Sequence, residues 1–255
     1  MRVARVLQTG LRLVYPPGCL TCNALVETDQ GLCGRCWRET PFVGGSICDA
    51  CGAPLVGDFA TCEDRCDDCL SMPRPWRSGR TAMVYGGNGR RIVLGLKHGD
   101  RMDFATPAAK WMARVAGDLV RPGMLIAPVP LHWRRRVKRR YNQSLLLGRG
   151  AARALELPFC PDLLLRRHQT PVLDGKGRAE RFATLDSALT IHPRRAAMVK
   201  GRAILLVDDV MTSGATLSAG TEALLRAGAA SVCVLTLARA VKDATFPGKD
   251  SGDPI

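Results

Sequence analysis

Residues 204–216 constrain the fold of this 255-residue chain more than any other segment. Four apolar residues, 204–207, run directly into Asp208 and Asp209, and a loop of small and hydroxyl residues follows at 212–216. An apolar run without polar alternation favours a strand that is covered on both faces, as in a parallel sheet. Because ligands of such sheets bind beyond the carboxyl ends of the strands, the two acids and the loop are predicted at a binding edge.

The chemistry of this segment indicates a sugar phosphate. Carboxylates accept hydrogen bonds from vicinal hydroxyls, so Asp208 and Asp209 suit a ribose, and they can also help to hold a divalent cation. The loop offers backbone N–H groups, a glycine and three hydroxyls, and it opens a helix predicted at 217–227, which together form an anion site. Gly228 fits a C-terminal cap of that helix. An ordinary strand–turn–helix needs one capping residue and not this whole set.

Nine of the 11 cysteines lie between residues 19 and 69, mostly in Cys-x-x-Cys pairs. Thiolates separated by two residues can grip one tetrahedral metal ion, and two such pairs complete a site. The pairs predict one zinc site formed by Cys19, Cys22, Cys33 and Cys36 and another formed by Cys48, Cys51, Cys66 and Cys69. Cys62 is an alternative to Cys66, because its spacing from Cys51 repeats that of the first site, but Cys66 forms a complete pair with Cys69.

Disulfides are the competing interpretation of these cysteines. The first 18 residues scatter arginines among apolar positions and lack the compact apolar core of a signal peptide, so a cytoplasmic location with reduced thiols is expected. This favours zinc. Four thiolates saturate the ion and leave no open position, so the predicted role is structural, in a segment with too few large apolar side chains to fold alone.

Basic residues outnumber acidic ones and give a net charge of +14, which favours polyanionic partners. The densest cluster packs six cations between Trp133 and Tyr141, after a short strand predicted at 125–130. These cations can neutralise a leaving pyrophosphate, contact nucleic-acid phosphates while the aromatic rings stack on bases, or form a solvated charged face. They are Arg134, Arg135, Arg136, Lys138, Arg139 and Arg140.

Alternating strand and helix patterns predict an α/β fold with a doubly wound parallel sheet, preceded by a small four-cysteine zinc-ribbon module. Further strands are expected at 81–85, 163–165 and 231–237, and helices at 90–97, 104–120 and 144–155. The predicted divisions are an amphipathic helix at 1–18, a double zinc ribbon at 19–70, a linker at 71–80, the α/β domain at 81–241 and a mobile tail at 242–255. No apolar run approaches the roughly 20 residues that span a bilayer.

The order of an apolar strand, Asp208-Asp209 and the loop 212–216 closely resembles the phosphoribosyl pyrophosphate (PRPP) motif of type I phosphoribosyltransferases. The resemblance implies that Asp208 and Asp209 hold the ribose hydroxyls. It implies that the 5′-phosphate is wrapped by Thr212, Ser213, Gly214, Ala215 and Thr216. PRPP would bind with Mg²⁺, and pyrophosphate would leave from the anomeric carbon.

The whole chain resembles the ComF family, which joins a double zinc ribbon to such a domain. The segments that carry the resemblance are 48–55, 96–100, 128–132 and 140–143. In the loop that covers the site, Arg178 and Arg181 would close over the pyrophosphate, but residues 170–173 lack the family's Gln, and Thr184 stands where Asn is expected. The resemblance implies phosphoribosyl transfer linked to DNA uptake and its machinery. The alternatives are a non-catalytic module that binds single-stranded DNA, with PRPP as a regulatory ligand, or a GntX-like metabolic role.

Overall fold

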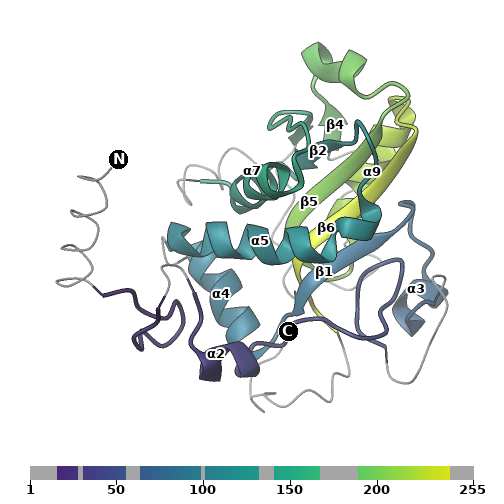
Figure 1. The fold of residues 1–255 in the computed structure, drawn as a ribbon. Coiled ribbons are helices and arrows are strands. Elements are labelled where there is room, and N and C mark those ends of the chain that lie inside the picture. Colours follow the sequence, from purple (N-terminus) through teal and green to yellow (C-terminus); the bar gives the residue numbers. More distant parts are fainter. Residues whose placement is uncertain are drawn as a thin grey trace, which may run out of the picture.

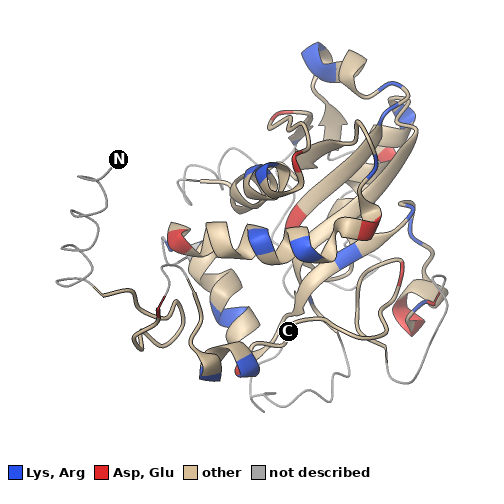
Figure 2. Ribbon diagram, in the orientation of Figure 1, with Lys and Arg blue, Asp and Glu red and all other residues tan. Residues whose placement is uncertain are grey.

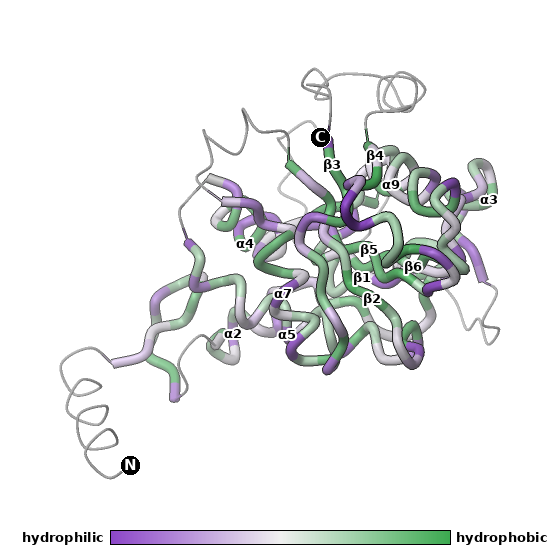
Figure 3. Tube along the Cα trace, turned by 90° about the horizontal axis from the view of Figure 1, so that it is seen from above, coloured by the Kyte–Doolittle hydropathy of each residue, from purple (hydrophilic) through white to green (hydrophobic). Residues whose placement is uncertain are grey.

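A parallel sheet forms the centre of the computed structural model, which describes residues 16–27, 31–55, 64–98, 101–131, 141–166 and 189–241 (Figure 1). Within these residues the sheet has four strands in the order β1-β6-β5-β2. They are β1 (Gly79–Val84), β6 (Ser231–Arg239), β5 (Ala203–Met211) and β2 (Leu125–Pro128). The tube in Figure 3 is coloured as hydrophobic along much of these strands, as expected for parallel strands that are buried on both faces.

Helices cover both faces of the sheet, which confirms the predicted doubly wound α/β fold. On one face lie α4 (Gly87–His98), α5 (Ala105–Val115) and α7 (Gln143–Leu155), and on the other lies α9 (Ala215–Arg226). Successive side chains of β5 point to opposite faces of the sheet. Leu205 packs in the core with α4, α5 and α7, whereas Leu206 packs in the core with α9.

Strand β5 is longer than its apolar run. It continues past Val207 through Asp208 and Asp209 to Met211, because the equally long β6 pairs with it to the end, with Asp208 opposite Thr236. The acids are therefore held in a paired strand. They lie near its carboxyl end, and Val210 and Met211 separate them from the loop.

The helix predicted at 104–120 is divided into three parts. Residues Met102–Phe104 form the short helix η1, α5 follows, and Gly117–Leu119 form the short helix η2. Gly117 is a weak helix former, and the chain then turns at Pro122 and Gly123, so the α-helix ends before this segment. The other predicted helices agree with α4, α7 and α9 apart from their ends.

A short two-stranded antiparallel sheet lies beyond the parallel sheet and packs on α9. It consists of β3 (Leu164–Arg166) and β4 (Leu189–Ile191), and the short helix η3 (Pro193–Met198) follows. Residue Phe159 makes a parallel bridge to Ile126, so the chain before β3 lies along the β2 edge. No helix among the described residues is both long and apolar enough to cross a membrane.

The two cysteine-rich parts pack on opposite sides of β1. The first contains α2 (Gly34–Glu39), and its Leu20 joins the core with α4 and α5. The second contains α3 (Asp67–Ser71), and its Ala50 joins the core with α9. Between them Phe42 makes an antiparallel bridge to Met83, so this segment covers the free edge of β1.

Candidate functional site

Two carboxylates at the end of β5 are held by partners from two helices. The Ser144 hydroxyl, at the start of α7, donates a hydrogen bond of 2.8 Å to Asp208 Oδ1, which also accepts from the Asp209 N–H at 2.9 Å. The Lys97 ammonium, near the end of α4, lies 3.3 Å from Asp209 Oδ1. Both side chains of this ion pair are largely buried, at 22% and 13% exposed. The acids are therefore oriented before any ligand arrives.

Burial and the charge of Asp209 raise the pKa of Asp208 to about 7, although the Ser144 hydrogen bond and Lys97 act in the opposite direction. Burial, and then the charge of Asp209, therefore disfavour the ionised form of Asp208 near neutral pH. A ligand that donates hydroxyl hydrogen bonds to both acids offsets this cost, because such bonds favour the ionised form.

Replacing Asp208 with Asn is expected to stabilise the ligand-free protein above neutral pH. The pKa of Asp208 in the native state lies above its ordinary value of 3.8, so the native state binds more protons than the unfolded chain between about pH 4 and pH 7. Stability of the wild type therefore falls as pH rises through this window. Asn accepts the Ser144 hydrogen bond without charge, so we expect its advantage to grow to about 1–3 kcal/mol at pH 8. Urea unfolding across the window measures it, and a pH-independent difference would contradict the expectation.

The amino end of α7 is anchored so that Ser144 faces β5. Asn142 caps the helix by accepting from the Ser144 N–H at 3.1 Å, and its own amide donates to the Val129 carbonyl. The Gln143 amide and the Tyr141 hydroxyl both donate to the Leu96 carbonyl, at 3.0 and 2.8 Å. These bonds join the start of α7 to the end of α4, and they fix Ser144 and Lys97 relative to the acids.

The loop after β5 leads directly into α9. Gly214 has a positive φ of 84° and is the N-terminal cap residue, and Ala215 begins the helix. The Ala215 N–H approaches the Ser213 hydroxyl at 3.4 Å. Thr212 is exposed and Thr216 is half-buried, so hydroxyl groups and the amino end of a 12-residue helix lie together at this turn. Such an arrangement favours an anion.

The eight predicted zinc ligands lie in two clusters of four, one of Cys19, Cys22, Cys33 and Cys36 and the other of Cys48, Cys51, Cys66 and Cys69. Within each cluster all sulfur atoms are within 4.8 Å of one another, and the pairs Cys22–Cys33 and Cys51–Cys66 are 3.6 and 3.7 Å apart. A tetrahedral ion with Zn–S bonds of about 2.3 Å requires sulfur separations of about 3.8 Å. The donor sets therefore fit zinc.

The chemistry of the second cluster also calls for a cation. Hydrogen bonding from Cys51 holds the pKa of Cys48 far below its ordinary value, while the same contact raises the pKa of Cys51. Four thiolates so close together need a positive ion to be ionised at once. The Arg74 Nε donates to Cys69 Sγ at 3.4 Å, which is the kind of outer contact that stabilises a metal-bound thiolate.

Some predicted residues lie outside the described part of the chain. These are the predicted N-terminal helix before Pro16, the tail from residue 242, Cys62, and the basic residues Arg134, Arg135, Arg136, Lys138, Arg139, Arg140, Arg178 and Arg181. Lys97 and Ser144 were not predicted as site residues. Each belongs to a segment that resembles the ComF pattern or directly follows one, but only the packing of α4 and α7 brings them to the acids.

Comparison with known proteins assigns each half of the chain to a known domain family. The family model of the double zinc ribbon domain matches residues 10–70, and that of the phosphoribosyl transferase domain matches residues 142–250. The DNA utilization protein YhgH of Shigella flexneri is 30% identical over 89% of this chain and 99% of its own length. Competence protein F of Haemophilus influenzae is 26% identical over 87% of this chain and 96% of its own. Competence protein ComFC of Bacillus subtilis is 28% identical over 84% and 87%. The chain therefore belongs to the ComF family, in which a double zinc ribbon precedes a phosphoribosyltransferase domain.

Proposed function

We propose that this chain binds PRPP at the end of β5 and transfers its phosphoribosyl group with release of pyrophosphate. The observation that carries the proposal is the pairing of two oriented carboxylates, Asp208 and Asp209, with an anion-type loop that begins three residues later. Ribose hydroxyls would donate to the acids. The 5′-phosphate would bind the loop, where Thr212, Ser213, Gly214, Ala215 and Thr216 offer N–H and hydroxyl donors.

The chemical barrier is charge separation, because an oxocarbenium-like ribose forms as pyrophosphate departs. Positioning and electrostatic stabilisation supply most of the rate enhancement in such a reaction. The carboxylates would hold the ribose and stabilise its developing positive charge. Arginines from 134–140, with Arg178 or Arg181, would receive the pyrophosphate. Mg²⁺ would accompany PRPP through its pyrophosphate oxygens and offset their charge.

Changing Asp208 and Asp209 together to Asn is expected to weaken PRPP binding in the presence of Mg²⁺ by at least about 100-fold, because two charge-assisted hydrogen-bond acceptors are lost. Isothermal titration measures the affinity. Asp162→Asn is the matched control, since it removes one charge from an ion pair with Arg195 outside the site. Unchanged affinity in the double variant would remove the sugar-binding role.

Turnover is tested separately from binding. Pyrophosphate release from PRPP is followed with candidate acceptors, including nucleobases and single-stranded DNA. Pyrophosphate release that requires one particular acceptor, and that is lost in the Asp208→Asn/Asp209→Asn variant, supports phosphoribosyl transfer. If PRPP binds tightly but releases no pyrophosphate with any acceptor, the result supports PRPP as a regulatory ligand instead.

A second candidate function is the binding of single-stranded nucleic acid. Two relatives are named as competence proteins and one as a DNA utilization protein, and the chain has a net charge of +14. On α2 the ring of Trp37 packs on Phe42 but stays partly exposed, and Arg35 and Arg38 are exposed on the same short helix. Figure 2 shows basic residues there and on α4. Aromatic rings among cations suit stacked bases and phosphates. This candidate requires oligonucleotide binding that weakens steeply with salt.

A further inference from the structure

Two buried arginines lie between the second cysteine cluster and the phosphate loop. The first is Arg74, which is 8% exposed and comes from the segment between α3 and β1. Its Nε donates to Cys69 Sγ at 3.4 Å, and its Nη1 donates to the Ser213 carbonyl at 2.6 Å. One guanidinium therefore contacts a predicted zinc ligand and the loop at the same time, although the two partners are far apart in sequence.

The second arginine, Arg239 at the end of β6, is 1% exposed. Its Nη1 donates to the carbonyls of Met211 and Thr212, and its Nη2 lies 3.1 Å from Asp68, which is between the ligands Cys66 and Cys69. An arginine stays charged in proteins, and Asp68 supplies the opposite charge for this buried guanidinium.

These contacts determine which way the loop presents its backbone. In a trans peptide the carbonyl of one residue and the N–H of the next point in opposite directions. The carbonyls of Met211, Thr212 and Ser213 are turned towards the two guanidinium groups. The N–H groups of the following residues, 212–214, therefore point away from the arginines. Successive N–H groups on one side form the kind of concave donor set that binds anions.

We propose that the metal-bound second cluster holds this loop in its phosphate-binding conformation through Arg74 and Arg239. The inference rests on the proposed function, because it names what regulates the phosphate site. Metal loss frees Cys69 and Asp68 to move. The two guanidinium groups then lose a fixed contact on the ribbon side, while their hydrogen bonds to the loop carbonyls remain. Occupancy of the second metal site thus controls affinity for the phosphorylated sugar, and the two arginines are positioning residues.

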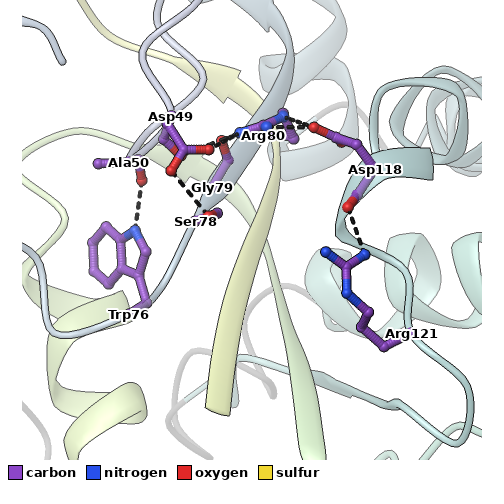
Figure 4. A network of polar contacts seen from close by, with 8 residues as sticks. All are labelled: Asp49, Ala50, Trp76, Ser78, Gly79, Arg80, Asp118 and Arg121. Atoms are coloured by element: carbon purple, nitrogen blue, oxygen red, sulfur yellow. Dashed lines mark hydrogen bonds and ion pairs between the residues drawn. The ribbon is translucent and has the colours of Figure 1, made fainter. Parts of the chain in front are cut away.

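A different arginine supplies the control, because it joins the same ribbon to the domain without touching the loop. Arg80 in β1 bonds Asp49 at 3.1 Å on the ribbon side and Asp118 at 2.9 Å on the domain side (Figure 4). Its side chain is 11% exposed, so it is buried to a similar degree as Arg74. Substitution of Arg80 therefore perturbs the interface and leaves the loop contacts in place.

The experiment compares Arg74→Lys with Arg80→Lys in the full zinc-loaded chain. Lysine keeps the charge but cannot span Cys69 and Ser213 together, so Arg74→Lys is expected to bind PRPP with Mg²⁺ about tenfold more weakly, whereas Arg80→Lys stays within about twofold of wild type. Both variants keep the wild-type zinc content. Equal affinities in the two variants would overturn the proposal.

Hydrogen exchange of the amides at 212–218 gives a readout that needs no ligand. Faster exchange is expected in Arg74→Lys and not in Arg80→Lys. If the wild type does not bind PRPP, the proposed function fails, and the exchange comparison alone decides the coupling. Identical exchange in the two variants would overturn the coupling whether or not PRPP binds.

Metal loss itself is compared between the two clusters with Cys66→Ser and Cys22→Ser. Each variant removes one ligand, and neither thiol is fully buried. Cys66→Ser is expected to lose one zinc, to weaken PRPP binding about tenfold or more and to expose the loop amides, because the coupling acts through the second cluster. Cys22→Ser is expected to lose one zinc with a clearly smaller effect on the loop. A larger loop effect from Cys22→Ser would reject the assignment.

Discussion

Removing zinc from the second cysteine cluster is expected to cause a large loss of stability. Cys48 and Cys51 are fully buried, and they share a core with Ala50 and Trp76 against the α9 side of the sheet. Without the ion, the buried thiols lose the charge that balances them. We expect Cys51→Ser to lower the melting temperature by more than about 10 °C and to lose one of two zinc ions per chain.

The control for this prediction is Cys160→Ser, because Cys160 is equally buried but belongs to neither cluster. It should keep both zinc ions and cost only about 1–2 kcal/mol, as is usual for a polar change in a core. Differential scanning fluorimetry and elemental analysis measure the two quantities. A Cys51→Ser protein with two zinc ions and the wild-type melting temperature would disprove the structural role of the cluster.

The second large effect is expected from Gly214→Ala. The φ of 84° at this position is one that side chains with a Cβ rarely adopt. A Cβ would also lie 2.9 Å from Arg74 Nη1 and 3.2 Å from the ring of Trp76, both of which are buried. The loop must shift to relieve the contact. We expect a loss of about 2–3 kcal/mol in stability and at least about 100-fold in PRPP affinity.

Gly201→Ala separates backbone strain from the steric contact. Gly201 has a similar positive φ of 66°, but a Cβ there meets nothing within 4 Å. It should therefore cost only about 1 kcal/mol and leave PRPP affinity unchanged. Chemical denaturation and titration calorimetry on both variants test the comparison. If Gly214→Ala behaves like Gly201→Ala, the loop does not need its close approach to Arg74.

The features that could be predicted from the sequence are those encoded within a few residues. The apolar run before Asp208, the small residues of the loop and the cysteine spacings are all local, so the β5–α9 turn and both cysteine clusters follow from them. The length of β5 does not follow, because pairing with β6 extends it beyond its apolar residues.

The residues that orient the site could not be predicted, because tertiary packing brings them there. Ser144 and Lys97 stand on separate helices, and each reaches the acids only when α4 and α7 pack together. Arg74 lies in a segment that resembles a polar linker, and Arg239 ends an apolar strand, so neither pattern indicates a contact with the loop. The partners of a buried arginine can be identified only from the folded structure.

The pairing of β1 with β6 has a consequence for how the chain is made. Asp68 meets Arg239 across 171 positions of sequence, and Arg74 meets Ser213 across 139. During synthesis, the cysteine-rich segments leave the ribosome well before the strand and loop against which they pack. The zinc ribbons can therefore bind their ions and fold before the segments that pack against them have been made. The phosphoribosyltransferase domain would then be completed last, when β6 pairs with β1.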